Sequence, residues 1–375
     1  MTKKLSLAFL FFISFSAAFA QSTQEMVEKI VKEAEGNSEL ENLAHELLDV
    51  VGPRLVGTPQ MKQANDWAVN KYKSWDIDAR NEEWGKWKGW ERGITHVDLI
   101  SPRIQSLEAR QLAWSPSTGK KGVQAEVMIL PAAKDSMDFV NKLKSVKGKF
   151  VMISMPQPTG RPDDNWEEWA TEESFEKMKK DRDSLSEVWR ERTSASGLSR
   201  RELPQALEKA GAAGIISSYW SRGFGVNKVF SSYTEEIPTI DISLEDYGML
   251  YRLAEYGDKP ELKVVAESQE LGEVPTFNTI AEIKGSEKPE EYVILSAHFD
   301  SWDGATGATD NGTGTIVMME AMRILKKKLT EDGFFNELRE REFYMSKGEK
   351  RRKERAAAAR RQKRNLEKRM IEQGY

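Results

Sequence analysis

The stretch SAHFDSWDGATGATDNGTG, residues 296–314, decides the fold more than any other part of the chain. It ends a nearly continuous apolar run, YVILSAH at Tyr292–His298, and the helix-like segment GTIVMMEAMRILKK, residues 314–327, follows it. A continuous apolar run is typical of a central strand buried on both faces of a sheet. The order strand, glycine loop and helix therefore predicts an α/β fold, with reactive groups on the loop at the carboxyl end of the strand.

The loop has the composition of half a metal site. His298 and Asp300 are two residues apart, so both side chains point the same way if the strand continues there. Asp310 returns at the start of the next helix, and imidazole and carboxylate groups are suitable zinc ligands. A carboxylate beside a ligating histidine can also orient its ring. A lone His-x-Asp is a weak signal, whereas HFDSW followed by GATDNGTG is far more specific.

Composition limits how a metal could be held. The 375-residue chain has no cysteine and three histidines, His45, His96 and His298. Disulfides are therefore excluded, and any metal must be held by His, Asp or Glu. His45 and His96 lie in ordinary helix-like and strand-like surroundings, so we interpret both as structural.

The net charge of −4 hides an asymmetry along the chain. Residues 326–375 carry 17 Lys and Arg against 9 Asp and Glu, a net charge of +8, which leaves −12 for residues 1–325. An acidic body with a basic tail indicates two partners or two origins.

The N-terminus, MTKKLSLAFLFFISFSAAFAQ, has the three parts of a secretory signal. Lys3 and Lys4 precede a short apolar run, and Ala18-Phe19-Ala20 is a small-x-small cleavage site. We therefore predict a signal peptide over residues 1–20 and a secreted or periplasmic protein. The apolar run is too short to span a bilayer and no later segment is apolar enough, so we expect no membrane anchor.

The chain between the signal and the loop divides into a helical start and a small α/β module. Residues 24–51 have a helical pattern, and Thr58 is a plausible cap for a second helix with Pro59 in its first turn. The tryptophan-rich stretch at residues 84–93 is interpreted as loop packing, with the wall of a substrate cleft as the alternative. Residues 122–268 contain four short strand-like runs and a charged helical stretch, Asn165–Arg192, without catalytic spacing.

Residues 298–302, HFDSW, and 307–314, GATDNGTG, resemble the first metal motif of the co-catalytic zinc exopeptidases of metallopeptidase family twenty-eight, which includes aminopeptidases and carboxypeptidase Q. The stretch GPRLVGTPQMKQANDWAVNKY and the tryptophan-rich stretch are similar to the same family. Residues 122–268 resemble the protease-associated domain often inserted there. This resemblance covers residues 24–327 and implies peptide substrates and two zinc ions.

The resemblance also implies roles for single residues. His298 would be a terminal ligand of one zinc, Asp310 would bridge two zincs, and Asp300 would orient His298. Two metals would activate a water for attack on a peptide carbonyl, with a glutamate as general base. The family's Glu-Glu pair, its later acidic ligand and its distant histidine are not found, and no histidine follows His298. We therefore expect neither a co-catalytic zinc pair nor peptidase activity from the chain as written. The family's remaining strands are missing as well, which predicts an unpaired edge and an uncovered apolar face.

The segment GFFNELREREFYMSKGEKRRKERAAAARRQKR, residues 333–364, resembles bacterial small-subunit ribosomal protein family twenty-one. Arg-Glu-Phe-Tyr at residues 341–344 and the basic run at 350–364 carry the resemblance, although Met345 stands where the family usually has a proline. The resemblance implies contacts with ribosomal RNA. The residues expected to make them are Arg341, Tyr344, Lys350, Arg351, Arg352, Lys353, Arg355, Arg360, Arg361, Lys363 and Arg364. A generic solvated basic helix, supported by interleaved Glu, is the alternative.

The two resemblances contradict each other, because export removes the chain from the cytoplasm where ribosomes work. We favour a fusion of two unrelated reading frames, by recombination or by misassembly of sequence data, over a true bifunctional protein, with the join near Leu325–Leu329. The predicted organisation is a signal peptide at 1–20, a partial zinc-exopeptidase domain at 21–121 and 269–327, a protease-associated-like insert at 122–268, and a basic helical tail at 328–375.

The predicted function is that of an exported zinc metallo-exopeptidase-like protein with an incomplete metal site. One alternative is a ribosomal RNA-binding protein that acts through its tail, which as a separate protein would be cytoplasmic. The other is a non-catalytic binding protein that uses the inserted module.

Overall fold

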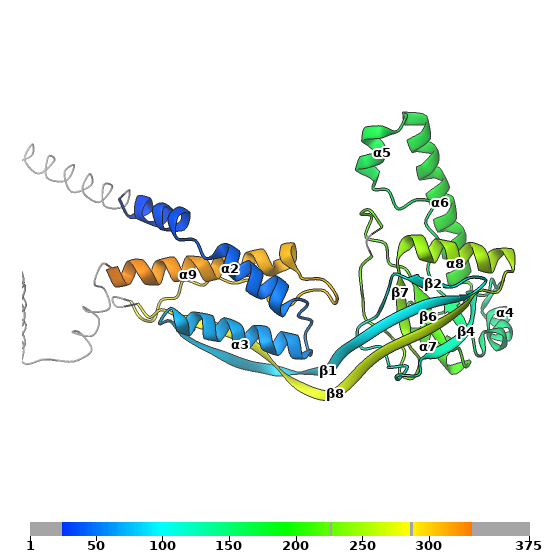
Figure 1. Ribbon diagram of the computed structural model, residues 1–375, viewed down its shortest axis with the longest axis horizontal. Coiled ribbons are helices and arrows are strands. Elements are labelled where there is room, and N and C mark those ends of the chain that lie inside the picture. Colours follow the sequence, from blue (N-terminus) through cyan, green and yellow to red (C-terminus); the bar gives the residue numbers. More distant parts are fainter. Residues whose placement is uncertain (1–24, 226, 286–287, 332–375) are drawn as a thin grey trace, which may run out of the picture.

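The computed structural model describes residues 25–225, 227–285 and 288–331, and it shows a mixed α/β protein. The described elements form two lobes that are joined by a long two-stranded ribbon (Figure 1). One eight-stranded mixed sheet has the order β2-β1-β8-β4-β5-β6-β7-β3. The predicted α/β class is confirmed. The predicted signal peptide and nearly all of the basic tail lie outside the described residues.

The ribbon consists of β1 (Asp78–Ser101) and β8 (Glu261–Glu282), which pair antiparallel along almost their whole length. Register shifts interrupt the pairing at four points, and such bulges bend a strand. The tryptophan-rich stretch predicted to be a loop lies inside β1, so that prediction is wrong. It is a strand because β8 supplies pairing partners for Gly85–Arg92, with one bulge between Gly89 and Trp90. β8 also runs without a break through residue 268, where we expected a domain boundary, and the domain division stays a prediction.

The four apolar runs predicted as strands each form one. They are β4 (Val123–Ile129), β5 (Phe150–Met152), β6 (Gly214–Ser217) and β7 (Thr239–Ile242), which pair parallel in this order. Two short strands, β2 (Gln105–Leu107) and β3 (Ala109–Gln111), add antiparallel to β1 and β7. Every residue of β5, β6 and β7 is buried, as expected for parallel strands covered on both faces.

Helices cover both faces of these parallel strands and together with them form the second lobe. On one face Phe150 and Met152 pack with Tyr247 and Leu250 of α8 (Leu244–Tyr256). On the other face Val151 packs with residues of α4 (Ser136–Lys142) and α7 (Glu202–Lys209). The predicted charged helix is two helices, α5 (Asp163–Trp169) and α6 (Glu172–Ser194), which project from the lobe (Figure 1). Thr171 separates them because its side chain caps α6 by accepting a hydrogen bond from the Ser174 N–H.

The first lobe is built from helices around the end of the ribbon at which Asp78 pairs with Glu282. They are a helix over residues 25–36, α2 (Leu40–Ala44) with a π-helical turn (His45–Val51), α3 (Pro59–Ser74) and α9 (Thr313–Glu331). Apart from the helix over residues 25–36, whose Val27, Ile30 and Val31 are exposed, their apolar faces meet in one core that includes Leu43, Ala68 and Ile316. Thr58 caps α3 as predicted, because its hydroxyl accepts from the Met61 N–H at 3.3 Å. In the part of the chain that the structure describes, no helix is long and apolar enough to cross a membrane.

Tyr292–His298 does not form the predicted buried central strand. Its apolar side chains are instead open to solvent, with Tyr292 70%, Val293 97%, Ile294 80% and Leu295 54% exposed. The physical reason is a missing neighbour, because none of the described strands pairs with this segment. An extended segment without neighbouring strands has no adjacent side chains against which its own apolar side chains can pack.

Candidate metal centre

A buried arginine fixes the base of the loop that carries the predicted site. The fully buried Arg54 side chain donates hydrogen bonds to four backbone carbonyl oxygens. These belong to Gly52 (3.3 Å), Phe299 (2.7 Å), Thr306 (2.5 Å) and Gly307 (3.2 Å). Burial lowers the pKa of Arg54, against the opposing charge of Asp300, yet the guanidinium has no carboxylate partner in an ion pair within the described residues. Arg54 therefore anchors the loop at Phe299 and at Thr306–Gly307.

The structure brings the three predicted site residues together. The His298 Nε2 atom lies 2.8 Å from Asp310 Oδ1, and the Nδ1 atom lies 3.2 Å from Asp300 Oδ1. Asp310 lies in the π-helical turn Ala308–Gly312 just before α9, and its peptide bond to Asn311 is cis. Gly307 begins this turn at φ 64°, in the left-handed region that favours glycine. All three side chains are about half exposed, so a solute can reach them.

These residues fit part of a zinc site and not the whole of one. Nε2 of His298 and the carboxylate of Asp310 converge, whereas Asp300 bonds the opposite ring nitrogen, as an orienting carboxylate would. Catalytic zinc sites use three protein ligands and structural sites use four. Among the described residues there is no group of three or more His, Asp or Glu side chains that could hold a metal. The two converging donors, His298 Nε2 and the Asp310 carboxylate, are therefore fewer than a catalytic zinc requires.

The other two histidines lie elsewhere. His45 is in the π-helical turn after α2, where its Nδ1 atom lies 3.0 Å from Asp49 Oδ2 in an exposed pair. His96 is in β1, opposite Val265 of β8. The pair of His45 and Asp49 is a useful internal comparison, because it has the chemistry of the His298 pair without a second carboxylate.

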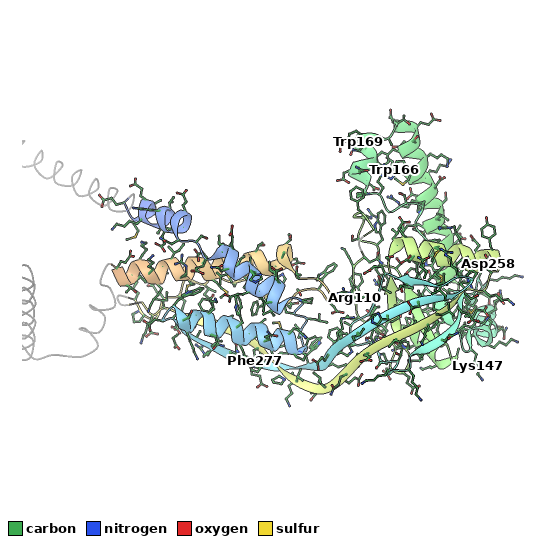
Figure 2. The ribbon with its side chains drawn as sticks, in the orientation of Figure 1. Arg110, Lys147, Trp166, Trp169, Asp258 and Phe277 are labelled. Atoms are coloured by element: carbon green, nitrogen blue, oxygen red, sulfur yellow. The ribbon has the colours of Figure 1, made fainter. Side chains whose placement is uncertain are left out.

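The tip of the loop that carries the site, Trp302–Gly304, is held against the ribbon and the second lobe by charged groups that the sequence did not predict. Asp303 is buried and forms an ion pair with Arg92 of β1. Burial raises the pKa of Asp303, while the charge of Arg92 opposes that rise. Arg110 of β3 donates from Nη1 to the Gly304 carbonyl oxygen at 3.0 Å, and Figure 2 shows Arg110 at the edge of the second lobe that faces the first. No sequence signal marks these pairs, since Arg92 and Asp303 are 211 residues apart.

Trp302 completes this contact. Its ring centroid lies 5.6 Å from that of Phe230, and the Lys228 Nζ atom lies 4.6 Å from the same Trp302 ring. Phe230 and Lys228 belong to the segment between β6 and β7 of the second lobe. The loop therefore carries the His298 cluster at its base and an aromatic contact with the second lobe at its tip.

The chain's sequence matches a known family at this loop. Residues 278–336 match peptidase family M28. Carboxypeptidase Q of Rattus norvegicus is 26% identical over 284 residues, which are 75% of this chain and 53% of the relative. Carboxypeptidase Q of Xenopus laevis is 28% identical over 318 residues, 81% of this chain and 59% of the relative. The chain thus spans little more than half the length of these curated relatives. The predicted resemblance to this peptidase family is confirmed for residues 278–336.

The fold is similar to that of a solved structure. The crystal structure of a peptidase M28 precursor from Shewanella amazonensis superposes with a TM-score of 0.54 at 24% identity. The superposition covers 82% of this chain and 64% of the other. At this identity the likeness speaks for the fold alone.

The second resemblance is also confirmed at the level of sequence. Residues 318–363 match ribosomal protein S21, and this match overlaps the peptidase match over residues 318–336. The overlap contains the join predicted near Leu325–Leu329. The eleven predicted RNA-contacting residues, from Arg341 to Arg364, lie outside the described residues, and their role stays a prediction.

Proposed function

We propose that the body of this chain is a zinc metallo-exopeptidase-like unit in which His298 and Asp310 are metal ligands and Asp300 orients the His298 ring. The observation that carries the proposal is the arrangement of the imidazole, whose Nε2 meets Asp310 at 2.8 Å while Nδ1 meets Asp300 at 3.2 Å. The match to peptidase family M28 and the likeness to carboxypeptidase Q support it. A peptide is accordingly the proposed substrate.

We also propose that the chain unaided holds no co-catalytic zinc pair and hydrolyses no peptide bond. Zinc would polarise a carbonyl or activate a water, but two converging donors are fewer than a catalytic zinc requires. The sequence offers no further histidine after His298. The described residues place the His298 imidazole next to the Asp310 carboxylate, and Asp300 orients the imidazole through its other nitrogen.

Zinc titration of the purified full chain tests both proposals. We expect at most one zinc per chain, lost in His298→Ala, and an affinity roughly tenfold lower in Asp300→Ala, because the carboxylate that bonds the His298 Nδ1 atom is removed. His45→Ala is the matched control, since it removes an exposed histidine that also bonds a carboxylate. Two tightly bound zincs with peptide cleavage would refute the proposed incomplete site. Equal loss of zinc in His45→Ala and His298→Ala would refute the ligand assignment.

A second function is proposed for the tail, and the match to ribosomal protein S21 favours it. Residues 328–375 would bind ribosomal RNA through their basic run, and binding would weaken steeply with salt because phosphate counterions are released. The test is RNA binding by the full chain across a salt series. A variant with Arg351, Arg352 and Lys353 changed to Gln should show a shallower slope. Unchanged affinity and slope in that variant would contradict the assignment.

Export and domain division are proposed on sequence grounds. We propose that residues 1–20 are removed after Ala20, that residues 122–268 are an inserted module, and that the tail belongs to a separate reading frame. Determination of the mature N-terminus in the source organism tests the first point, with Gln21 as the expected first residue. A long DNA read across the codons for residues 310–344 tests the fusion.

A further inference from the structure

Basic side chains from the second lobe gather around the tip of the site loop. The Lys228 Nζ atom lies 4.6 Å from the centre of the Trp302 ring. Arg110 donates to the Gly304 carbonyl oxygen at 3.0 Å. Both contacts fall within six residues of His298 along the loop. The two cations are therefore held next to the loop that carries the candidate metal centre.

A third cation extends this group along an aromatic row. The guanidinium carbon of Arg200 lies 4.8 Å from the ring centre of Tyr219 and 5.3 Å from that of Phe230. Phe230 in turn packs against Trp302, with ring centroids 5.6 Å apart. Stacking on aromatic faces restrains these cations without neutralising their charge. Less conformational entropy is then lost when they bind an anion.

These three groups keep a net positive charge, because the buried carboxylate on which the charge of Arg110 acts, Asp303, is already paired with Arg92. Within the described residues, Lys228, Arg110 and Arg200 have no carboxylate oxygen in ion-pair contact, whereas the neighbouring Arg92 is paired with Asp303. All three side chains are exposed. They lie on a body whose overall charge is strongly negative, so the cationic group is a local exception that would attract an anion.

We propose that Lys228, Arg110 and Arg200 form an anion-recognising surface beside the His298 centre, which selects peptides that carry a carboxylate. That the ligand is a peptide rests on the proposed function. A carboxylate can accept charge-assisted hydrogen bonds from these groups, and Trp302 offers an apolar face to the adjoining part of the peptide. The carboxylate can belong to an acidic side chain or to the free end of the chain, and the same three cations would recognise either.

Peptide binding to the metal-free full chain tests this surface without requiring catalysis. The probes are three acetylated tetrapeptides, titrated by calorimetry in the presence of EDTA. One is Ala-Ala-Ala-Ala amide, one is Ala-Ala-Glu-Ala amide, and one is Ala-Ala-Ala-Ala with a free carboxylate. The variants are Lys228→Gln and Arg110→Gln. Lys147→Gln is the matched control, because Lys147 is an exposed lysine on another side of the same lobe (Figure 2).

We expect at least one carboxylate-bearing probe to bind roughly fivefold tighter than the neutral amide, and each site variant to lose most of that preference. The preference should also fade at high salt. The probe that binds identifies the source of the carboxylate. Equal binding of all three probes, or equal loss in Lys147→Gln, would overturn the proposal. Because no metal is present, failure of zinc binding leaves this result intact and separates the two proposals.

Discussion

Two apolar runs of similar composition differ sharply in burial in this molecule. Phe150–Met152 forms β5, lies between two parallel neighbours, and has every residue fully buried. Tyr292–Leu295 is as apolar, yet no described strand pairs with it and Val293 is 97% exposed. The difference teaches that an apolar run specifies only a tendency to be buried. Neighbouring strands and covering helices decide whether the tendency is met.

Truncation of one side chain in each run should give the largest difference in the free energy of unfolding. Phe150→Ala removes a fully buried ring from the second lobe, so we expect a loss of about 3–5 kcal/mol in the free energy of unfolding. Val293→Ala removes side-chain atoms that are already in water and should change it by less than about 0.5 kcal/mol. Denaturant unfolding of both variants gives the comparison. Similar losses would mean that Val293 is buried in solution.

This contrast also explains what the sequence could predict. The four strands of the second lobe and the cap at Thr58 were predictable, because the pattern and its neighbours lie within the same stretch of chain. The His298, Asp300 and Asp310 cluster was predictable from local spacing and family resemblance. The Tyr292–His298 strand was not correctly predicted, because burial depends on partners. Arg54 and the pair of Arg92 and Asp303 were missed because they join segments that are distant in sequence.

The loop that follows the exposed run is anchored by the buried Arg54 side chain. Arg54→Met keeps the apolar volume but removes the donors to three loop carbonyls, at Phe299, Thr306 and Gly307, and to the Gly52 carbonyl. We expect a loss of about 3 kcal/mol in stability and weaker zinc binding, because the carbonyls lose their partners and the loop its anchor. Arg80→Met is the control, since Arg80 is exposed and pairs with Glu82 at the surface. If both variants behaved alike, Arg54 would not anchor the site.

A third contrast separates two buried carboxylates, one in each lobe. Glu33 is 5% exposed, and the hydrogen bond from Lys327 is the main cause that lowers its pKa below the ordinary 4.5. Asp241 is 3% exposed and has only neutral donors, so burial raises its pKa from 3.8 to about 7. Glu33 therefore stabilises the fold above pH 4.5, and this contribution is lost as pH falls through its lowered pKa. The contribution of Asp241 is present below pH 3.8 and is lost as pH rises through about 7.

Unfolding measured across pH tests this opposition. Asp241→Asn should remove a fall in stability on the order of 2 kcal/mol between pH 4 and pH 7, because the neutral amide still accepts from Ser217 and the Tyr219 N–H. Glu33→Gln should instead flatten the loss seen under acid conditions. If Asp241→Asn left the neutral limb of the curve unchanged, burial would not be what governs this carboxyl.

The smallest effect on stability returns to the exposed run. Val293→Lys should change the free energy of unfolding by less than about 0.5 kcal/mol, because the side chain is in water before and after the change. It should nevertheless reduce concentration-dependent association, since four consecutive exposed apolar residues without a paired strand favour edge-to-edge contact and a lysine opposes it. Sedimentation velocity at several protein concentrations measures this. Ile104→Lys is the matched control, as Ile104 is 84% exposed but stands alone in the other lobe. Equal behaviour of the two variants would show that isolated exposure, and not the unpaired run, drives association.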